Sequence, residues 1–196
     1  MMRARNKETN GNIRAVAPVD VATITETLLK VINGNDHHLS DMADNKAQLL
    51  ITVNSLILSA IISLSLGHLK EFHALVVPVL ILLVTSMVTL VFAILSTRPS
   101  LPRGKFTMTD LAEKKVNLLF FGNFYQMPMS DFSAGMTHLL SDADFIYQSL
   151  ITDIYKQGII LGRKYRLLRV AYNIFMTGFI LAIATFVVVM RKSMFG

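Results

Sequence analysis

DIYKQGIILGRKYRLLRVAYNIFMTGFILAIATFVVVMR, residues 153–191, begins as a polar, basic segment and ends as an uncharged apolar run. It contains no proline and no cluster of turn residues that would interrupt a helix. The segment therefore predicts a charged helical rod that continues directly into a membrane span. At about 1.5 Å per residue the whole rod would be on the order of 70 Å long. Because no hinge interrupts it, a shift at the polar end would reach the membrane or be resisted there.

The composition also indicates a membrane protein. Of the 196 residues, 53% are hydrophobic and 16% are charged, whereas roughly 25% charged residues is usual for soluble domains. Three runs contain about twenty residues without a charge, which is the length needed to cross roughly 30 Å of hydrocarbon. A core helix of a soluble protein would show a charged face, and these runs show none. We expect spans at Ala47–Leu66, Leu75–Leu95 and Val170–Met190.

The positions of Lys and Arg predict the orientation of these spans. The first connection, residues 67–74, contains only Lys70, whereas the 96–169 segment is basic near both of its ends. We therefore expect that segment and the N-terminus to lie in the cytoplasm. Three crossings then leave the C-terminal tail outside, although Arg191 and Lys192 argue weakly against this topology.

These features predict an all-α membrane protein whose last span is continuous with a long amphipathic helix. The expected parts are a disordered tail (1–20), a cytoplasmic helical stalk (21–46), a transmembrane hairpin (47–95), a cytoplasmic helical region (96–169), a third transmembrane helix (170–190) and a tail (191–196). The sequence Asn33-Gly34-Asn35 predicts a break in the stalk. Asp110 should cap a short helix, and Ser141 should cap the long one.

Apolar residues recur along the long helix in alternating steps of four and three, which is heptad spacing. This stripe comprises Tyr147, Ile151, Ile154, Gly158, Leu161, Tyr165, Leu168 and Tyr172. Heptad spacing predicts packing against a partner helix. Either the stalk before the first span or a second copy of the chain could be that partner.

Small and polar residues recur on one face of each span, in many cases every fourth position. The candidates are Asn54, Ser55, Ser59, Ser63, Thr85, Thr89, Asn173 and Thr177. Such faces allow helices to pack closely, or they line a polar path in an oligomer. The spans contain no Asp, Glu, Lys or Arg, which argues against a proton-coupled transporter.

The sequence shows no recognisable catalytic apparatus, because phosphate-binding glycine loops, paired-His metalloprotease motifs and activated nucleophiles are missing. We therefore expect no enzyme activity and no cofactor. His37 and Asp41 lie one helical turn apart, but without a third ligand they do not predict a metal site. The chain has no cysteine, so disulfides and thiolate metal sites are excluded.

Three segments resemble the transmembrane effector family of Pycsar anti-phage defence (PycTM-like proteins). They are ADNKAQLLITVNSLILSAII (43–62), NLLFFGNF (117–124) and IYKQGIILGRKYRLLRVAYNIF (154–175), and the similarity extends over about residues 36–190. In that family a pyrimidine cyclase encoded nearby makes cCMP or cUMP on infection, and the effector responds. The resemblance implies an inner-membrane effector that compromises the membrane, so that the cell dies by abortive infection before phage matures. We also expect a homo-oligomer that contacts lipids and nucleotide but no nucleic acid.

The resemblance also implies a nucleotide site, but the chain has no room for a separate β-roll nucleotide-binding domain. The ligand would bind among the cytoplasmic helix ends and the 97–141 segment. The candidate contacts are Asn45, Lys46, Asn123, Asp153, Gln157, Arg163, Lys164 and Arg166. Basic side chains would meet the phosphate, and Asp, Asn or Gln would read the base and ribose. The same basic residues could instead bind anionic lipid, at about 1 kcal/mol each.

Two further functions stay open at the level of sequence. The chain could be a non-conducting membrane anchor or signalling adaptor that recruits a soluble partner through the heptad stripe. A small transporter is the least favoured interpretation, because no ionisable residue lies within a span to couple transport.

Overall fold

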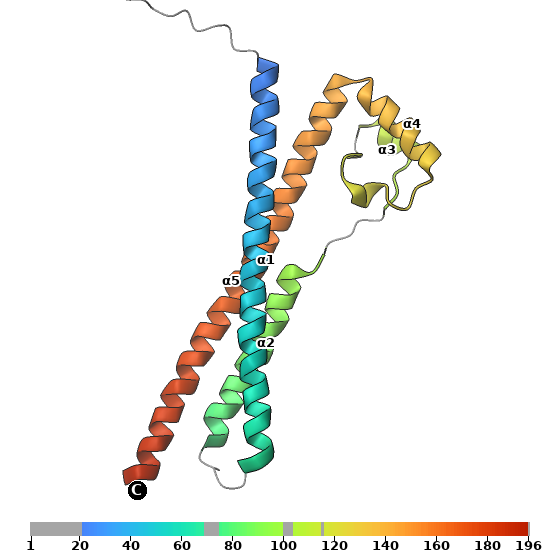
Figure 1. The fold of residues 1–196 in the computed structure, drawn as a ribbon. Coiled ribbons are helices and arrows are strands. Elements are labelled where there is room, and N and C mark those ends of the chain that lie inside the picture. Colours follow the sequence, from blue (N-terminus) through green and yellow to red (C-terminus); the bar gives the residue numbers. More distant parts are fainter. Residues whose placement is uncertain (1–20, 69–74, 100–103, 115, 196) are drawn as a thin grey trace, which may run out of the picture.

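The computed structural model describes residues 21–68, 75–99, 104–114 and 116–195, and every regular element in them is helical (Figure 1). The elements are α1 (Val21–His68), α2 (Val76–Thr97), α3 (Met108–Ala112), η2 (Phe121–Asn123), α4 (Met129–Leu140) and α5 (Ala143–Phe195). The predicted all-α fold and the unbroken final helix are thus confirmed. The disorder predicted for residues 1–20 lies outside the described residues.

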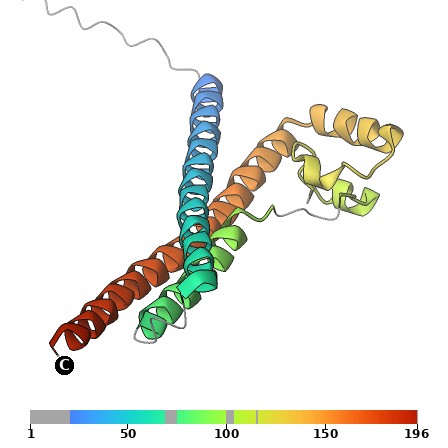
Figure 2. The same cartoon turned by 60° about the horizontal axis from the view of Figure 1, so that its bottom comes forward.

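Within the described part of the chain, three helices are long and apolar enough to cross a membrane. The apolar segments lie within Thr23–Ser63, Val76–Thr97 and Ala143–Met194, as the sequence predicted. In Figures 1 and 2, α1 and α2 lie side by side while α5 crosses them and its C-terminal end diverges. Phe186 and Val187 of that end are exposed within the chain, so these apolar side chains would face lipid or another protein.

Helix α1 runs without interruption through Asn33-Gly34-Asn35, so the predicted break is wrong. A glycine inside a helix costs only about 1 kcal/mol relative to alanine. Helix propagation is cooperative, and one weak position inside 48 helical residues does not outweigh the hydrogen bonds on both sides. A Cβ added at Gly34 would meet nothing within 4 Å, so no neighbouring element bends the helix there.

Between α2 and α5 the chain forms a small head that packs beside the start of α5 (Figure 1). Its core contains Phe106, Leu111, Val116, Leu118, Leu139 and Phe145. Gly135 packs closely against this core, because an added Cβ would lie 2.9 Å from the Phe106 ring and 3.2 Å from Leu118, so a larger residue would displace these side chains. The head is therefore a packed unit that fixes the chain segment 117–124 against α5.

Two helix caps in the head differ from those that were predicted. Thr107, not Asp110, caps α3, and Asp110 serves as its partner three residues later in a capping box. Asp142, not Ser141, caps α5, because its carboxylate accepts the Phe145 N–H at 3.2 Å. The Lys114 ammonium, 2.5 Å from the Asp142 carboxylate, holds the pKa of that carboxyl below its ordinary value, and the Phe145 N–H adds to this.

The heptad stripe is only half covered. Tyr165, Leu168 and Tyr172 pack on Ala43 and Ala47 of α1, which confirms the stalk as one partner. Tyr147 and Ile151 at the other end are 41% and 61% exposed. The reason is geometric, because α1 and α5 diverge above their crossing point (Figure 1).

Candidate functional site

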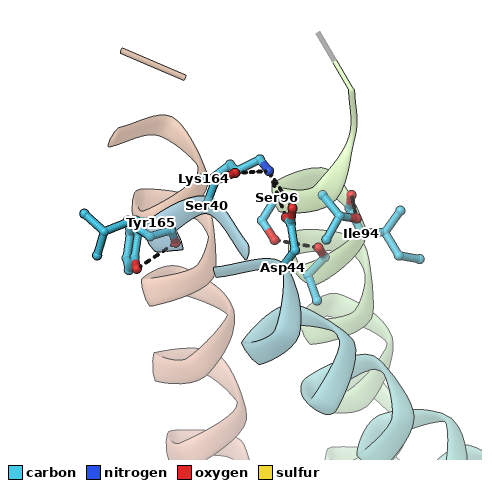
Figure 3. A network of polar contacts seen from close by, with 9 residues as sticks. Ser40, Asp44, Ile94, Ser96, Lys164 and Tyr165 are labelled. Atoms are coloured by element: carbon cyan, nitrogen blue, oxygen red, sulfur yellow. Dashed lines mark hydrogen bonds and ion pairs between the residues drawn. The ribbon is translucent and has the colours of Figure 1, made fainter. Parts of the chain in front are cut away.

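A polar contact between α1 and α5 forms where the two helices cross (Figure 3). Lys164 Nζ donates to the Asp44 carboxylate at 2.7 and 2.9 Å and to Ser40 Oγ at 3.0 Å. Tyr165 OH donates to the Leu39 carbonyl at 3.1 Å. We call Ser40, Asp44, Lys164 and Tyr165 the α1–α5 clamp. Asp44 and Lys164 of the clamp lie in two of the three segments that carry the family resemblance.

Small residues let the helices approach closely below the clamp. Ala47 of α1 is fully buried against Leu168, and Leu50, Ala93 and Ala171 form a contact among α1, α2 and α5. Further along, an added Cβ at Gly178 would lie 2.1 Å from Thr85 Oγ1. The backbones of α2 and α5 can therefore keep this spacing only if position 178 lacks a side chain.

The polar residues of the spans divide into two groups. Asn54, Thr85 and Thr89 are buried within the chain, whereas Ser55, Ser59, Ser63, Asn173 and Thr177 are exposed. Asn54 Nδ2 donates to the Leu50 carbonyl at 2.8 Å. Asn54 Oδ1, Ser86 Oγ and Thr89 Oγ1 are buried without a hydrogen-bond partner. The first group therefore packs inside the bundle, and the second faces lipid or a neighbouring copy.

A groove follows one face of α5 from η2 to the end of α2. Its upper end, about 310 Å³, is lined by Phe120, Asn123, Asp153, Lys156, Gln157, Ile159 and Ile160. Its lower end, about 160 Å³, is lined by Leu95, Ser96, Arg98, Ile159, Ile160, Arg163, Lys164 and Leu167. The two ends share Ile159 and Ile160, so they adjoin, and we call them together the α5 groove.

Amide and carboxylate groups form a fixed network at the upper end. Asp153 accepts from Asn117 Nδ2 at 2.8 Å and from Gln157 Nε2 at 2.6 Å. Asn123 Nδ2 donates to the Asn117 carbonyl at 2.6 Å. Asn117 is 1% exposed, so a buried side chain holds Asp153 and Asn123 in place. This end can recognise the polar edge of a small molecule.

The lower end is positively charged. Arg98 and Arg163 are exposed, and no ion pair joins either of them to a carboxylate in the described residues. Lys164, by contrast, is engaged with Asp44 in the clamp. Because Gln157 and Arg163 are six residues apart, the two ends are separated by about 9 Å along the helix axis. The groove thus presents amides at one end and free guanidinium groups at the other.

A second cleft of about 490 Å³ lies between α1 and α5. It shares Phe120, Asp153, Gln157 and Ile160 with the groove and is lined further by Asn33, Asp36, His37, Ser40, Leu119, Phe121 and Leu161. The charged residues that line this cleft are the acids Asp36 and Asp153. The cleft therefore suits an anionic ligand less well than the α5 groove does. Among the described residues no cluster of His, Cys, Asp or Glu could hold a metal ion.

The predicted ligand contacts are therefore only partly brought together. Asn123, Asp153 and Gln157 meet at the upper end of the groove, and Arg163 and Lys164 lie at the lower end. The remaining three candidates, Asn45, Lys46 and Arg166, are exposed and line neither end.

Sequence reasoning missed Arg98, Asn117, Phe120 and Lys156. Arg98 is one of the basic residues near the end of the second span, and Asn117 and Phe120 lie within the apolar segment NLLFFGNF. No local pattern distinguishes Asn117 from a surface asparagine, because its burial depends on the packing of the head against α5.

The fold and the groove define a class: a helical protein with three helices long and apolar enough to span a membrane, and a small head beside a groove that runs along the last of them. Within that class the chain belongs to the Pycsar effector protein domain family (PycTM), whose pattern it matches over residues 27–191. It is thus an anti-phage effector, as the resemblance implied. Neither the curated proteins nor the solved structures contain a match to it.

Proposed function

We propose that this protein is an inner-membrane effector that binds a cyclic pyrimidine nucleotide, cCMP or cUMP, and then impairs membrane integrity, causing abortive infection. The head and the N-terminus lie in the cytoplasm, where a cognate pyrimidine cyclase supplies the nucleotide. The protein acts through binding and not through catalysis, and it needs no cofactor. The observation that carries this proposal is the polarity of the α5 groove.

The two ends of the groove suit the two ends of a nucleotide. Arg98 and Arg163 would bind the cyclic phosphate, because guanidinium groups match phosphate oxygens in geometry and charge. Asn123, Asp153 and Gln157 would hydrogen-bond the base. The Phe120 ring supplies apolar surface at the upper end, and the Ile159 and Ile160 side chains supply it between the two ends. Each part of the ligand thus has a chemically matched neighbour.

The response reaches the membrane through α5. A bound nucleotide would draw the end of α2, which carries Arg98, toward α5 and the head. Helix α5 is continuous from the groove to Phe195, so a rotation at Gln157 is transmitted into the span. Inside the bundle, the unpartnered atoms of Asn54, Ser86 and Thr89 would be solvated by water if the helices separated.

Several copies acting together would make the switch steeper. A ligand that takes a two-state protein from mostly closed to mostly open must prefer the open state by about 5.5 kcal/mol. In a homo-oligomer with one groove per copy, each site could prefer the open state by a smaller free energy, because the contributions of the sites add up. The exposed polar residues Ser55, Ser59, Asn173 and Thr177 are the candidates for contacts between copies or for lining a pore.

The direct test is leakage of dye from liposomes that contain the purified full-length protein. We expect cCMP or cUMP to trigger leakage, and the double variant Arg98→Ala/Arg163→Ala to lower the response at least tenfold, because each charge-assisted hydrogen bond contributes about 1.5–3 kcal/mol. Lys30→Ala, which removes an exposed positive charge that lines neither end of the groove, is the matched control. Liposomes that stay sealed with both nucleotides would refute the proposal.

The exposed half of the heptad stripe favours one alternative function. Tyr147 and Ile151 remain uncovered in the chain and could bind a soluble partner, so that the protein would act as a non-conducting adaptor. Site-specific crosslinking separates the two functions. Crosslinks between third spans of two copies support the effector, whereas capture of a soluble protein at Ile151 or Leu161 supports the adaptor.

A further inference from the structure

We propose that two copies of this chain pair through the stalk of α1 (residues 21–46), which forms a parallel two-stranded coiled coil with the same stalk of the second copy. This inference rests on the homo-oligomer of the proposed function and adds the surface through which two copies meet. It follows from the heptad spacing, the exposure and the charges of one face of the stalk.

The apolar residues of the stalk lie on a face that α5 does not cover. Ile24, Leu28 and Val31 follow one another in steps of four and three, and they are 42%, 55% and 63% exposed. At 3.6 residues per turn, their face lies about 110° around the helix from Ala43 and Ala47, which pack on α5. In Figures 1 and 2 this part of α1 stands apart from α5. The contact between α1 and α5 therefore leaves this face open to another partner.

The heptad continues from the stalk to the start of the first span. The a and d positions, which form the seam of a coiled coil, are Ile24, Leu28, Val31, Asn35, His38, Met42, Asn45 and Leu49. All of them except Met42 are exposed within the chain. An asparagine at an a position, as at Asn35, fixes the register and the number of strands at a cost in stability. The apolar residues thus supply the attraction, and the polar ones make the pairing specific.

Two charged residues beside the seam are complementary between copies. Asp41 occupies a g position, and Lys46 occupies the e position five residues later. Side chains at these two positions meet across a parallel coiled coil and determine which helix is accepted as partner. Both residues are exposed, and neither side chain is paired with another described residue. A symmetric dimer contains the pair twice, so the charges favour a second copy of this stalk.

The membrane favours the parallel arrangement that this seam requires. Copies that insert by the same charge rule share one orientation, so their stalks run in the same direction. A two-fold axis normal to the membrane then brings the same face of both stalks together. Because the seam reaches Leu49, pairing would also bring the first spans of the two copies together where they enter the membrane.

The test is disulfide crosslinking of the full-length protein in isolated membranes. The chain contains no cysteine, so single-cysteine variants have no background. We expect Leu28→Cys and Val31→Cys to form disulfide-linked dimers on oxidation. Glu26→Cys and Asn33→Cys, which occupy f positions on the opposite side of the helix, should stay monomeric.

Crosslinking that is absent at Leu28 and Val31, or equal at all four positions, would overturn the interface. Because this experiment uses no nucleotide, it can fail while nucleotide-triggered leakage persists, and the proposed function would then stand without this interface. Sealed liposomes together with heptad-patterned dimers would refute the proposed function and leave the interface supported.

Charge reversal tests the pairing of Asp41 with Lys46. In the Leu28→Cys background, Asp41→Lys places like charges opposite each other twice and should lower the crosslinked fraction roughly fivefold. The double reversal Asp41→Lys/Lys46→Asp should restore it. Asp36→Lys makes the same charge change outside the seam and should leave the fraction unchanged. If the double reversal crosslinks no better than Asp41→Lys alone, the two stalks do not meet in this register and the inference is wrong.

Discussion

Lys164 shows how one side chain acquires its role from a contact distant in sequence. Its ammonium group bonds to Asp44, which lies 120 residues earlier in the chain. From the sequence it was a candidate phosphate ligand, like its neighbour Arg163. The structure separates the two, because Lys164 points to α1 whereas Arg163 is exposed beside the groove. Local sequence cannot make this distinction, since both side chains are long and positively charged and lie on adjacent positions of one helix.

The clamp should contribute a measurable coupling free energy between Asp44 of α1 and Lys164 of α5. The Lys164 side chain is 17% exposed and that of Asp44 42%, so solvent screening limits the pair to about 1 kcal/mol. A double-mutant cycle with Asp44→Asn and Lys164→Met, read by thermal unfolding in detergent, should give a coupling of about 0.5–1 kcal/mol.

The pair Glu26–Lys30 provides the matched control for that cycle. Both of its side chains are more than two-thirds exposed, so its coupling should be smaller than that of the clamp. A coupling at Asp44–Lys164 no larger than at Glu26–Lys30 would show that the clamp does not hold the helices together.

At the scale of elements, the sequence predicted helix α5 well and helix α1 less well. Residues 153–191 contain no competing local signal, so a continuous helix was the simple expectation. Asn33-Gly34-Asn35 is chemistry typical of turns, and a local rule assigned a break there. The rule failed because the residues on both sides favour helix and nothing packs on Gly34 to bend it. The heptad stripe was predicted to be covered along its whole length, although α1 and α5 touch along only half of it. The spacing of apolar residues does not give the angle at which two helices cross, and this angle separates α1 from the first turns of α5.

The crossing of α2 and α5 yields a prediction about Gly178. A methyl group at this position would clash with Thr85, so Gly178→Ala must push the two helices apart. Overpacking of this kind typically costs 1–3 kcal/mol, and we expect the thermal midpoint in detergent to fall accordingly.

Gly162→Ala is the control for that variant, because a Cβ at Gly162 meets nothing within 4 Å. It should leave stability unchanged or raise it by up to about 1 kcal/mol, since alanine favours helix more than glycine does. Equal effects of the two substitutions would mean that α2 and α5 do not approach each other closely in the membrane.

At the scale of the whole molecule, the α5 groove unites parts that the sequence presents separately. Arg98 follows the second span, Asn123 belongs to the head, and Asp153 begins the basic rod. The kinds of side chain expected at the site could be predicted from the sequence, because basic and amide groups suit an anionic ligand. Which of these side chains lie together could not be predicted, because this depends on how the head folds back on α5. For this reason Asn45 and Lys46 were predicted as contacts, although they line neither end of the groove, and Asn117 was overlooked.

Whether α5 transmits the signal as one rigid body can be measured directly by placing a flexible glycine linker after Leu167, between the groove and the third span. The linker variant should still bind the nucleotide in the groove, but nucleotide-triggered leakage from liposomes should be lost. The same linker placed after Arg191, beyond the span, should leave leakage intact. If the Leu167 variant binds nucleotide and leaks as strongly as the unaltered protein, α5 does not couple the groove to the membrane.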